Sequence, residues 1–217
     1  MKKKNLKKLL LAVCCAALLV CVSIGATVAY LTSKATVTNT FTVGKVAITL
    51  DEAKTNVEGE PLDKDGKVVT DIANAKRDNG NQYKLMPGHE YTKDPTVHVE
   101  ANSENSWIFV KVENGIADIE DQNNTIKSQI EVKGWKQLTD ADGKAVVGVY
   151  YKEYTQNDKV ENLVVFESFK IDGTNVDSEK LKTYEGETIV VTAYAIQKDG
   201  FTAPEAAWTA VSGAYNG

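Results

Sequence analysis

Cysteine is confined to the first 21 residues of the chain, where Cys14, Cys15 and Cys21 are the only three. If that part is removed, the remaining chain can form no disulfide and offers no thiolate for catalysis or metal binding. Histidine is also scarce, with only His89 and His98. A folded domain of this composition must therefore derive its stability from its core.

Charge is absent from the stretch between positions 8 and 34. Five lysines precede this stretch, an apolar run covers 9–22, and small residues follow. This three-part layout is typical of a secretory signal. We expect cleavage between Ala29 and Tyr30, with Thr27 and Ala29 as the small residues at the third and first positions before the cut.

Two other interpretations of this leader stay open. The uncharged stretch of about 25 residues is long enough to span a bilayer, so a retained anchor is the main alternative. Lipoprotein attachment is disfavoured because Cys14 and Cys21 each follow Val, where a small residue is required. In every case the lysines stay cytoplasmic and the rest is exported. We divide the chain into a signal peptide, 1–29, and a single secreted domain, 30–217.

Acidic residues are in excess after the leader. The chain has 25 basic and 30 acidic residues, and the leader contains five of the basic and none of the acidic ones. The secreted part therefore has 20 basic against 30 acidic residues, a net charge of −10. Such a surface argues against nucleic acid and anionic membranes as partners. Ordinary solvated surface charge explains it without assigning any partner.

Short strand patterns separated by turn signals dominate the secreted part. Residues 45–51 alternate, and Val46, Ile48 and Leu50 share one face of a half-buried strand. Residues 52–84 are polar and are interpreted as an excursion that is mobile or lies on the surface, with a hairpin around 63–66. Further strands are expected at 36–41, 96–100, 107–113, 135–138, 145–154, 163–171 and 188–197.

The connections between these strands complete the expected fold. Residues 145–154 and 163–171 are expected to pair with each other, whereas 115–130 is either a short helix or a loop. Pro204 in a first-turn position and Gly213 just after Val211 predict a short capped helix or a turn over 202–211. About eight or nine strands without βαβ alternation predict an all-β sandwich, immunoglobulin-like in type, preceded by an N-terminal signal helix. No fixed-period repeat occurs.

Two segments resemble a known family. The leader end (GATVAY) is followed by the strand motif NTFTVGKV at 39–46, and residues 85–113 contain a Pro-Gly turn, Lys-Asp, a strand, an Asn-Ser turn and an apolar strand. In this order the segments resemble the TasA/camelysin family, whose signal peptides are processed by the SipW-type signal peptidase of Gram-positive bacteria. Residues 52–84 and 115–180 do not align with the family pattern.

The resemblance implies a jelly-roll β-sandwich, export to the cell surface or biofilm matrix, and assembly into fibres. A physical route to assembly exists because the cut would free a strand-forming N-terminus that contains Thr36, Val37, Asn39 and Phe41. Such a strand can add to a neighbour's open sheet edge, and a head-to-tail contact of this kind makes filaments. Alternatively, the strand pairs within its own sandwich.

Enzymatic chemistry finds little support in the sequence. The camelysin name implies a metallopeptidase, but His89-Glu90 is not followed by the second histidine of an H-E-x-x-H motif. Convergence of His89, His98 and Glu100 on zinc is disfavoured, since catalytic zinc needs three ligands and an open position. We expect no catalytic, cofactor or metal residues, and we expect a SipW-type peptidase and self-association or other matrix proteins as partners.

Two other binding possibilities are weak. Residues 63–66 and 140–143 hint at calcium loops but lack the closing Glu of an EF-hand, so hairpin turns are favoured. A group of aromatic residues fits core packing better than a sugar-binding face: Tyr150, Tyr151, Tyr154, Phe166 and Phe169. The sequence therefore predicts a non-enzymatic structural protein of the bacterial surface. The alternatives are a camelysin-type metallopeptidase and an adhesion or carbohydrate-binding module.

Overall fold

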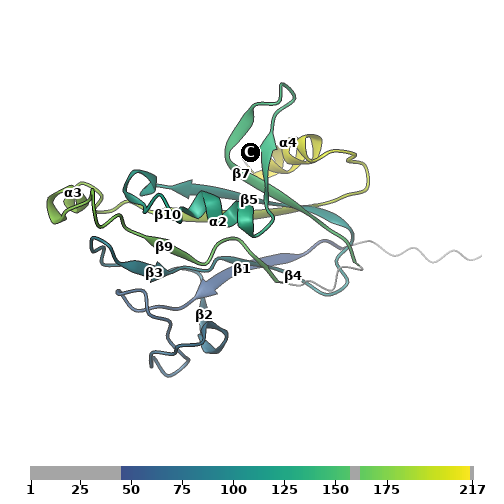
Figure 1. Ribbon diagram of the computed structural model, residues 1–217. Helices are drawn as coiled ribbons and strands as arrows, with labels where there is room; N and C mark the ends of the chain where they lie inside the picture. The colour runs from purple at the N-terminus through teal and green to yellow at the C-terminus, as the bar shows by residue number, and fades with distance from the viewer. Residues whose placement is uncertain (1–44, 157–161, 216–217) are drawn as a thin grey trace, which may run out of the picture. The chain divides into compact units, whose positions relative to one another are not determined.

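Two antiparallel sheets form the body of the protein in the computed structural model, which describes residues 45–156 and 162–215 (Figure 1). The first sheet has the order β2-β1-β4-β8, the second β10-β5-β7-β6, and β3 pairs with β9. The all-β class is thus confirmed. The strands are β1 (Ile48–Ala53), β2 (Arg77–Asp78), β3 (Glu90–Thr92), β4 (Thr96–Val99), β5 (Ser106–Asn114), β6 (Lys136–Thr139), β7 (Ala145–Tyr154), β8 (Asn162–Val164), β9 (Ser168–Lys170) and β10 (Ile189–Gln197).

The helices are short, and all except the C-terminal one lie between strands in the sequence. The ambiguous segment 115–130 contains both η2 (Ala117–Ile119) and the start of α2 (Ile126–Val132), whose N-terminus is capped by Thr125. The predicted helix near the C-terminus is confirmed as α4 (Pro204–Tyr215), which continues beyond Gly213. The remaining helices are η1 (Ile72–Asn74) and α3 (Ser178–Lys182). Within the described residues, no helix is long and apolar enough to cross a membrane.

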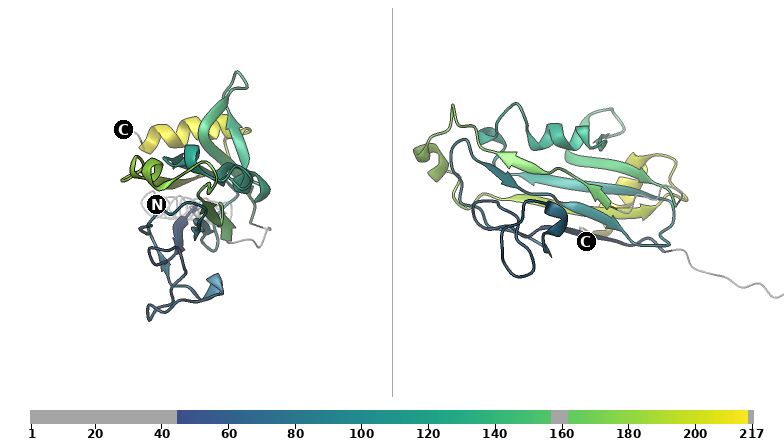
Figure 2. Two further views of the ribbon diagram at one scale, coloured as in Figure 1. Left: turned by 60° about the vertical axis from the view of Figure 1, so that its left-hand side comes forward. Right: turned by 60° about the horizontal axis from the view of Figure 1, so that its bottom comes forward.

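Two apolar clusters explain why several strands are apolar on both faces. In β5, Ile108 and Val110 point into the core between the sheets, whereas Trp107 and Phe109 pack on the opposite face. That opposite face is covered by α4 through Ala207 and other residues (Figure 2). The prediction of a central strand at 107–113 is confirmed, because β5 has β10 on one side and β7 on the other.

The expected pairing of 145–154 with 163–171 is wrong. β7 pairs with β5 and β6, whereas 163–171 is divided into β8, which pairs with β4, and β9, which pairs with β3. Between β8 and β9, Val165 and Phe166 are fully buried. The backbone of this stretch stays beside 93–95, because Val165 N donates to Pro95 O and Lys93 N donates to Glu167 O. Burial of the 163–171 side chains against the first sheet therefore determines its partner.

The polar excursion is more integrated than its composition suggests. The hairpin around 63–66 is confirmed, with Asp63 N donating to Lys67 O at 2.9 Å and Leu62 paired to Val68. The segment then returns to the body of the protein through β2, whose Arg77 pairs with Ala53 of β1. The expected signal helix and the strand at 36–41 lie outside the described residues.

Candidate functional site

The outer face of the first sheet carries a row of polar side chains. The register places Thr49 of β1 opposite His98 of β4, and His98 opposite Asn162 of β8. Asp51 is the diagonal neighbour of His98, two residues along β1 from Thr49, which is within reach of a long side chain. Because the apolar residues of β1 and β4 pack into the core, the polar residues between them share the outer face.

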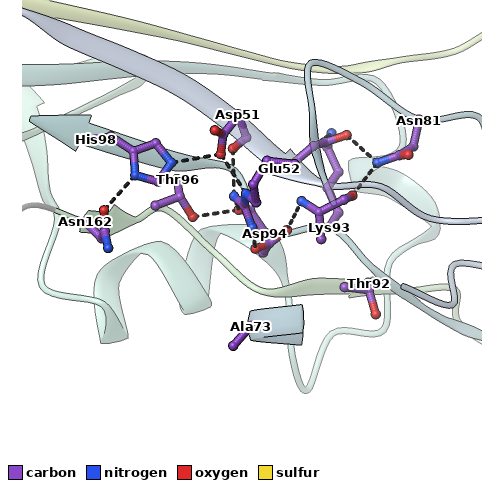
Figure 3. Close-up of polar contacts among 12 residues, drawn as sticks. Asp51, Glu52, Ala73, Asn81, Thr92, Lys93, Asp94, Thr96, His98 and Asn162 are labelled. Carbon is purple, nitrogen blue, oxygen red and sulfur yellow. Dashed lines mark hydrogen bonds and ion pairs between the residues drawn. The ribbon is translucent and has the colours of Figure 1, made fainter. Parts of the chain in front are cut away.

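His98 bridges two strands. Its Nε2 lies 2.8 Å from Asp51 Oδ1, and its Nδ1 lies 2.6 Å from Asn162 Oδ1 (Figure 3). Partial burial alone would raise the pKa of Asp51, but hydrogen bonds from His98 and Arg77 outweigh that effect and lower the pKa. The histidine therefore belongs to a hydrogen-bonded network that joins β1 to β8 across β4.

Arg77 is the only arginine in the chain and joins the excursion to the sheet. Its Nε donates to Asp51 Oδ1 at 2.8 Å and its Nη1 donates to Asp94 Oδ2 at 2.5 Å. The other carboxylate oxygen of Asp94 accepts from Ala53 N at 2.6 Å. A planar guanidinium can serve two carboxylates in this way, which the single ammonium of a lysine does less well.

A second ionic pair lies deeper, next to the first. Lys93 Nζ is 2.6 Å from Glu52 Oε2, and both residues are buried, 8% and 4% exposed. Asn81 Nδ2 donates to Glu52 Oε1 at 2.9 Å and to Ala53 O at 2.8 Å. Burial, with the Glu52 carboxylate nearby, raises the pKa of the adjacent Tyr83. Both carboxylate oxygens of Glu52 thus accept a hydrogen bond, one from Lys93 and one from Asn81, as a buried carboxylate requires.

These contacts make one ionic cluster that connects four parts of the chain. The ionic cluster consists of Asp51, Glu52, Arg77, Asn81, Lys93, Asp94, His98 and Asn162 (Figure 3). It holds the return of the excursion between β1 and the residues that precede β4. Sequence reasoning missed it, because each partner taken alone resembles an ordinary surface residue. The single arginine among 25 basic residues was the one available signal.

The two histidines and Glu100 have separate partners. His89 Nε2 is 2.8 Å from Glu58 O, and its ring meets the Tyr91 ring at 4.5 Å between centroids. Glu100 pairs with Lys45 at 2.5 Å. Among residues 45–156 and 162–215, no group of three His, Cys, Asp or Glu side chains is placed to hold a metal ion.

The structure describes two further groups of predicted residues, the Asp-Gly segments and the aromatic group, but not the N-terminal residues. Residues 63–66 and 140–143 are turns, closed by Asp63 and Asp140, each of which accepts two backbone N–H groups. The aromatic group is confirmed as core, with Tyr151 on the α4 side of the second sheet and the other four on the inter-sheet side. The residues of the predicted cleavage site, Thr27, Ala29 and Tyr30, lie outside the described residues. So do Thr36, Val37, Asn39 and Phe41 of the candidate assembly strand.

In the ribbon, α4 lies beside the hairpin of β6 and β7 (Figure 1). A groove of about 650 Å³ is lined by residues of α4, of this hairpin and of the segment that leads into α4. Leu138, Val146 and Ala203 give it an apolar lining, and Trp208 and Glu205 also face it. No family model, curated protein or solved structure matches this chain.

Proposed function

We propose that the protein is an exported, non-enzymatic structural component of a Gram-positive cell surface or biofilm matrix, which assembles into fibres by strand exchange. In this proposal the two sheets form a jelly-roll or immunoglobulin-like sandwich. A SipW-type signal peptidase releases the N-terminal strand, and a neighbouring subunit receives it. The resemblance to the TasA/camelysin family supports the export route, and the edge of the second sheet supports the assembly.

The observation that carries the proposal is the composition of β10. This nine-residue strand has β5 on one side and is the outermost strand of its sheet among the described residues. Its sequence, IVVTAYAIQ, contains no charge, no proline and no glycine. Sheet edges are normally protected by such residues, because an unprotected edge pairs with other chains. The edge of β10 is therefore suited to receive a strand.

The segment that would be donated precedes β1 in the sequence. Residues 30–41 contain only one charge, Lys34, and the strand-forming residues Thr36, Val37 and Phe41. An added strand gains main-chain hydrogen bonds along the edge and side-chain contacts on alternate residues. A subunit that donates at one end and receives at its edge forms an open chain.

Electron microscopy of three forms tests this proposal. The full-length precursor is expected to remain single particles, the form that starts at Tyr30 to make filaments, and the form that starts at Thr42 to remain single particles. N-terminal sequencing of the secreted product establishes the natural start. Filaments from the form that starts at Thr42 would disprove strand donation by residues 30–41.

A charge placed on β10 gives a second test. Val190 is 43% exposed on this strand, so Val190→Lys is expected to reduce filament length or abolish filaments while the monomer stays folded. Val147→Lys is the matched control, since Val147 is 89% exposed on β7 and lies away from the edge. Equal filament lengths for both variants, measured by microscopy, would show that β10 is not the receiving edge.

The groove beside α4 favours the alternative of a surface-binding module. A concave apolar lining that includes a tryptophan and a few polar groups is typical of a ligand site, and Trp208 and Glu205 provide this combination. The microscopy separates the two functions, because a module of this kind would give single particles from the form that starts at Tyr30.

A further inference from the structure

Glu52 connects the buried amine of Lys93 to the partly buried amide of Asn81. One carboxylate oxygen is 2.6 Å from Lys93 Nζ, and the other accepts from Asn81 Nδ2 at 2.9 Å. The three residues come from β1, from the position directly after β3, and from the return of the excursion. The side chains of Lys93 and Asn81 therefore meet on the carboxylate of Glu52 (Figure 3).

The surroundings of Asn81 favour attack on its side-chain carbonyl. Asn81 Oδ1 accepts a hydrogen bond from Thr55 N at 2.9 Å, and its Nδ2 donates to Ala53 O at 2.8 Å. A backbone N–H directed at a carbonyl oxygen stabilises the negative charge that develops there when a nucleophile adds. The amide is thereby both polarised and fixed in orientation.

Glu52 is placed to move the proton that such a reaction requires. A lysine amine becomes a nucleophile only after it loses its proton, and a buried lysine beside a general base can do so. A carboxylate within hydrogen-bond reach of both the nucleophile and the leaving group can act first as base and then as acid. Burial of Lys93 and Glu52 limits the access of water to the amine and to the proton carrier.

We propose that Lys93 and Asn81 form an intramolecular isopeptide bond, with Glu52 as the proton carrier. The Lys93 ammonium gives one proton to Glu52, and Nζ adds to Asn81 Cγ. The Cγ–Nδ2 bond then breaks and Glu52 returns its proton to the leaving nitrogen. One of the two protons that remain on Nζ also passes to that nitrogen, and the other stays on the new amide. The products are a secondary amide and one ammonium ion, so Glu52 is unchanged and no oxidant or reductant is needed.

The new bond would close the loop 81–93 covalently. It would fasten the return of the excursion to the residues that lead into β4, at the point where the ionic cluster already holds them together. In a domain without cysteine after its leader, this is a covalent constraint that does not depend on a disulfide. The inference is independent of the proposed assembly, because a monomer would form the same bond.

Intact mass of the purified secreted protein tests the proposal. The wild type is expected to weigh about 17 Da less than its sequence, the mass of one ammonia. Glu52→Gln and Lys93→Arg are each expected to show the full sequence mass, with circular dichroism to confirm folding. A tryptic digest of the wild type should contain residues 78–84 joined to a peptide in which the chain is uncut after Lys93.

Two controls address other sources of the same mass loss. Asn79-Gly80 can also lose ammonia by forming a succinimide, so Gly80→Ala is expected to keep the deficit if the isopeptide bond causes it. Lys54→Arg changes the more exposed pair of Lys54 with Asp78, and it should also keep the deficit. A wild type at full mass, or a deficit that disappears in Gly80→Ala, overturns the proposal even if the Glu52 variant does not fold.

Discussion

At the scale of single residues, Glu120 is a carboxyl group whose burial opposes its ionisation. Only 4% of Glu120 is exposed. Burial raises its pKa, and a long hydrogen bond from Ile126 N, at 3.4 Å, only partly offsets this. The folded state therefore holds the proton more tightly than the unfolded state. As the pH rises from the ordinary pKa of Glu through the raised folded value, stability is lost and is not regained at neutral pH.

The substitution Glu120→Gln removes the loss of folding stability that ionisation of Glu120 causes. We expect the variant to be more stable than the wild type at pH 7 by about 1 kcal/mol, because the cost of burying a charge is avoided. Near pH 4 the two should be nearly equal, since the wild-type carboxyl is then protonated. Urea unfolding at both pH values measures the difference. Glu131→Gln, at an exposed helical pair, is the control and should change stability by less than about 0.5 kcal/mol. A Glu120→Gln variant that is less stable at pH 7 would contradict the argument.

The ionic cluster shows why its residues could not be identified from the sequence. Arg77 contacts Asp51 and Asp94, which are 26 and 17 positions away, and local composition gives no signal for such distant pairs. Burial of Lys93 and Glu52 also depends on what packs over them, which only the folded chain determines. By contrast, the turns at 63–66 and 140–143 follow from Asp and Gly at adjacent positions, so they were predictable.

At the scale of elements, Gly148 lies where β7 stops pairing with β5 and continues beside β6 alone. Its φ is +71°, and a Cβ built there would lie 2.5 Å from Val112 O. The pairing of β7 with β5 ends beside this glycine, at Lys111 and Val149, and the rest of β7 extends as a hairpin with β6. A left-handed backbone and a close approach therefore coincide at one position.

We expect Gly148→Ala to cost about 3 kcal/mol, because both strain and steric overlap arise. Gly143 is the matched control. It also has a positive φ, +78°, but a Cβ there meets nothing within 4 Å, so Gly143→Ala should cost only about 1 kcal/mol. Urea unfolding of the two variants and the wild type measures both costs. Equal losses would mean that the Val112 carbonyl moves away without a penalty.

Strand positions were more predictable than strand partners. The alternation in β1 and the two apolar faces of β5 follow from local burial, which has a period of two along any strand. The partner of 163–171 was wrong because proximity in the sequence favours a hairpin with 145–154. The structure instead buries Val165, Phe166 and Phe169 in the inter-sheet core, beside β3 and β4. Burial of these side chains in the core thus determined the strand partner, although the short loop after 145–154 favoured a hairpin.

At the scale of the whole molecule, the net negative charge opposes the proposed association of subunits, whereas the uncharged edge of β10 favours it. A subunit cut after Ala29 has a net charge of −10, from 20 basic and 30 acidic residues. Like-charged subunits repel each other over a distance set by the salt concentration, from about 30 Å at 0.01 M to about 8 Å at 0.15 M. The β10 edge carries no charge, so main-chain pairing at contact is insensitive to salt. In the proposed assembly, growth should therefore be limited by the approach of subunits rather than by the strength of the final contact.

The proposed assembly thus predicts that salt accelerates fibre growth. Seeded growth of the form that starts at Tyr30, followed by light scattering, should be roughly tenfold faster at 0.15 M than at 0.01 M sodium chloride. Choline chloride at equal ionic strength should give the same acceleration, because screening depends on ionic strength and not on the identity of the cation. Slower growth in salt would show that ion pairs between subunits, and not the uncharged β10 edge, form the contact that drives assembly.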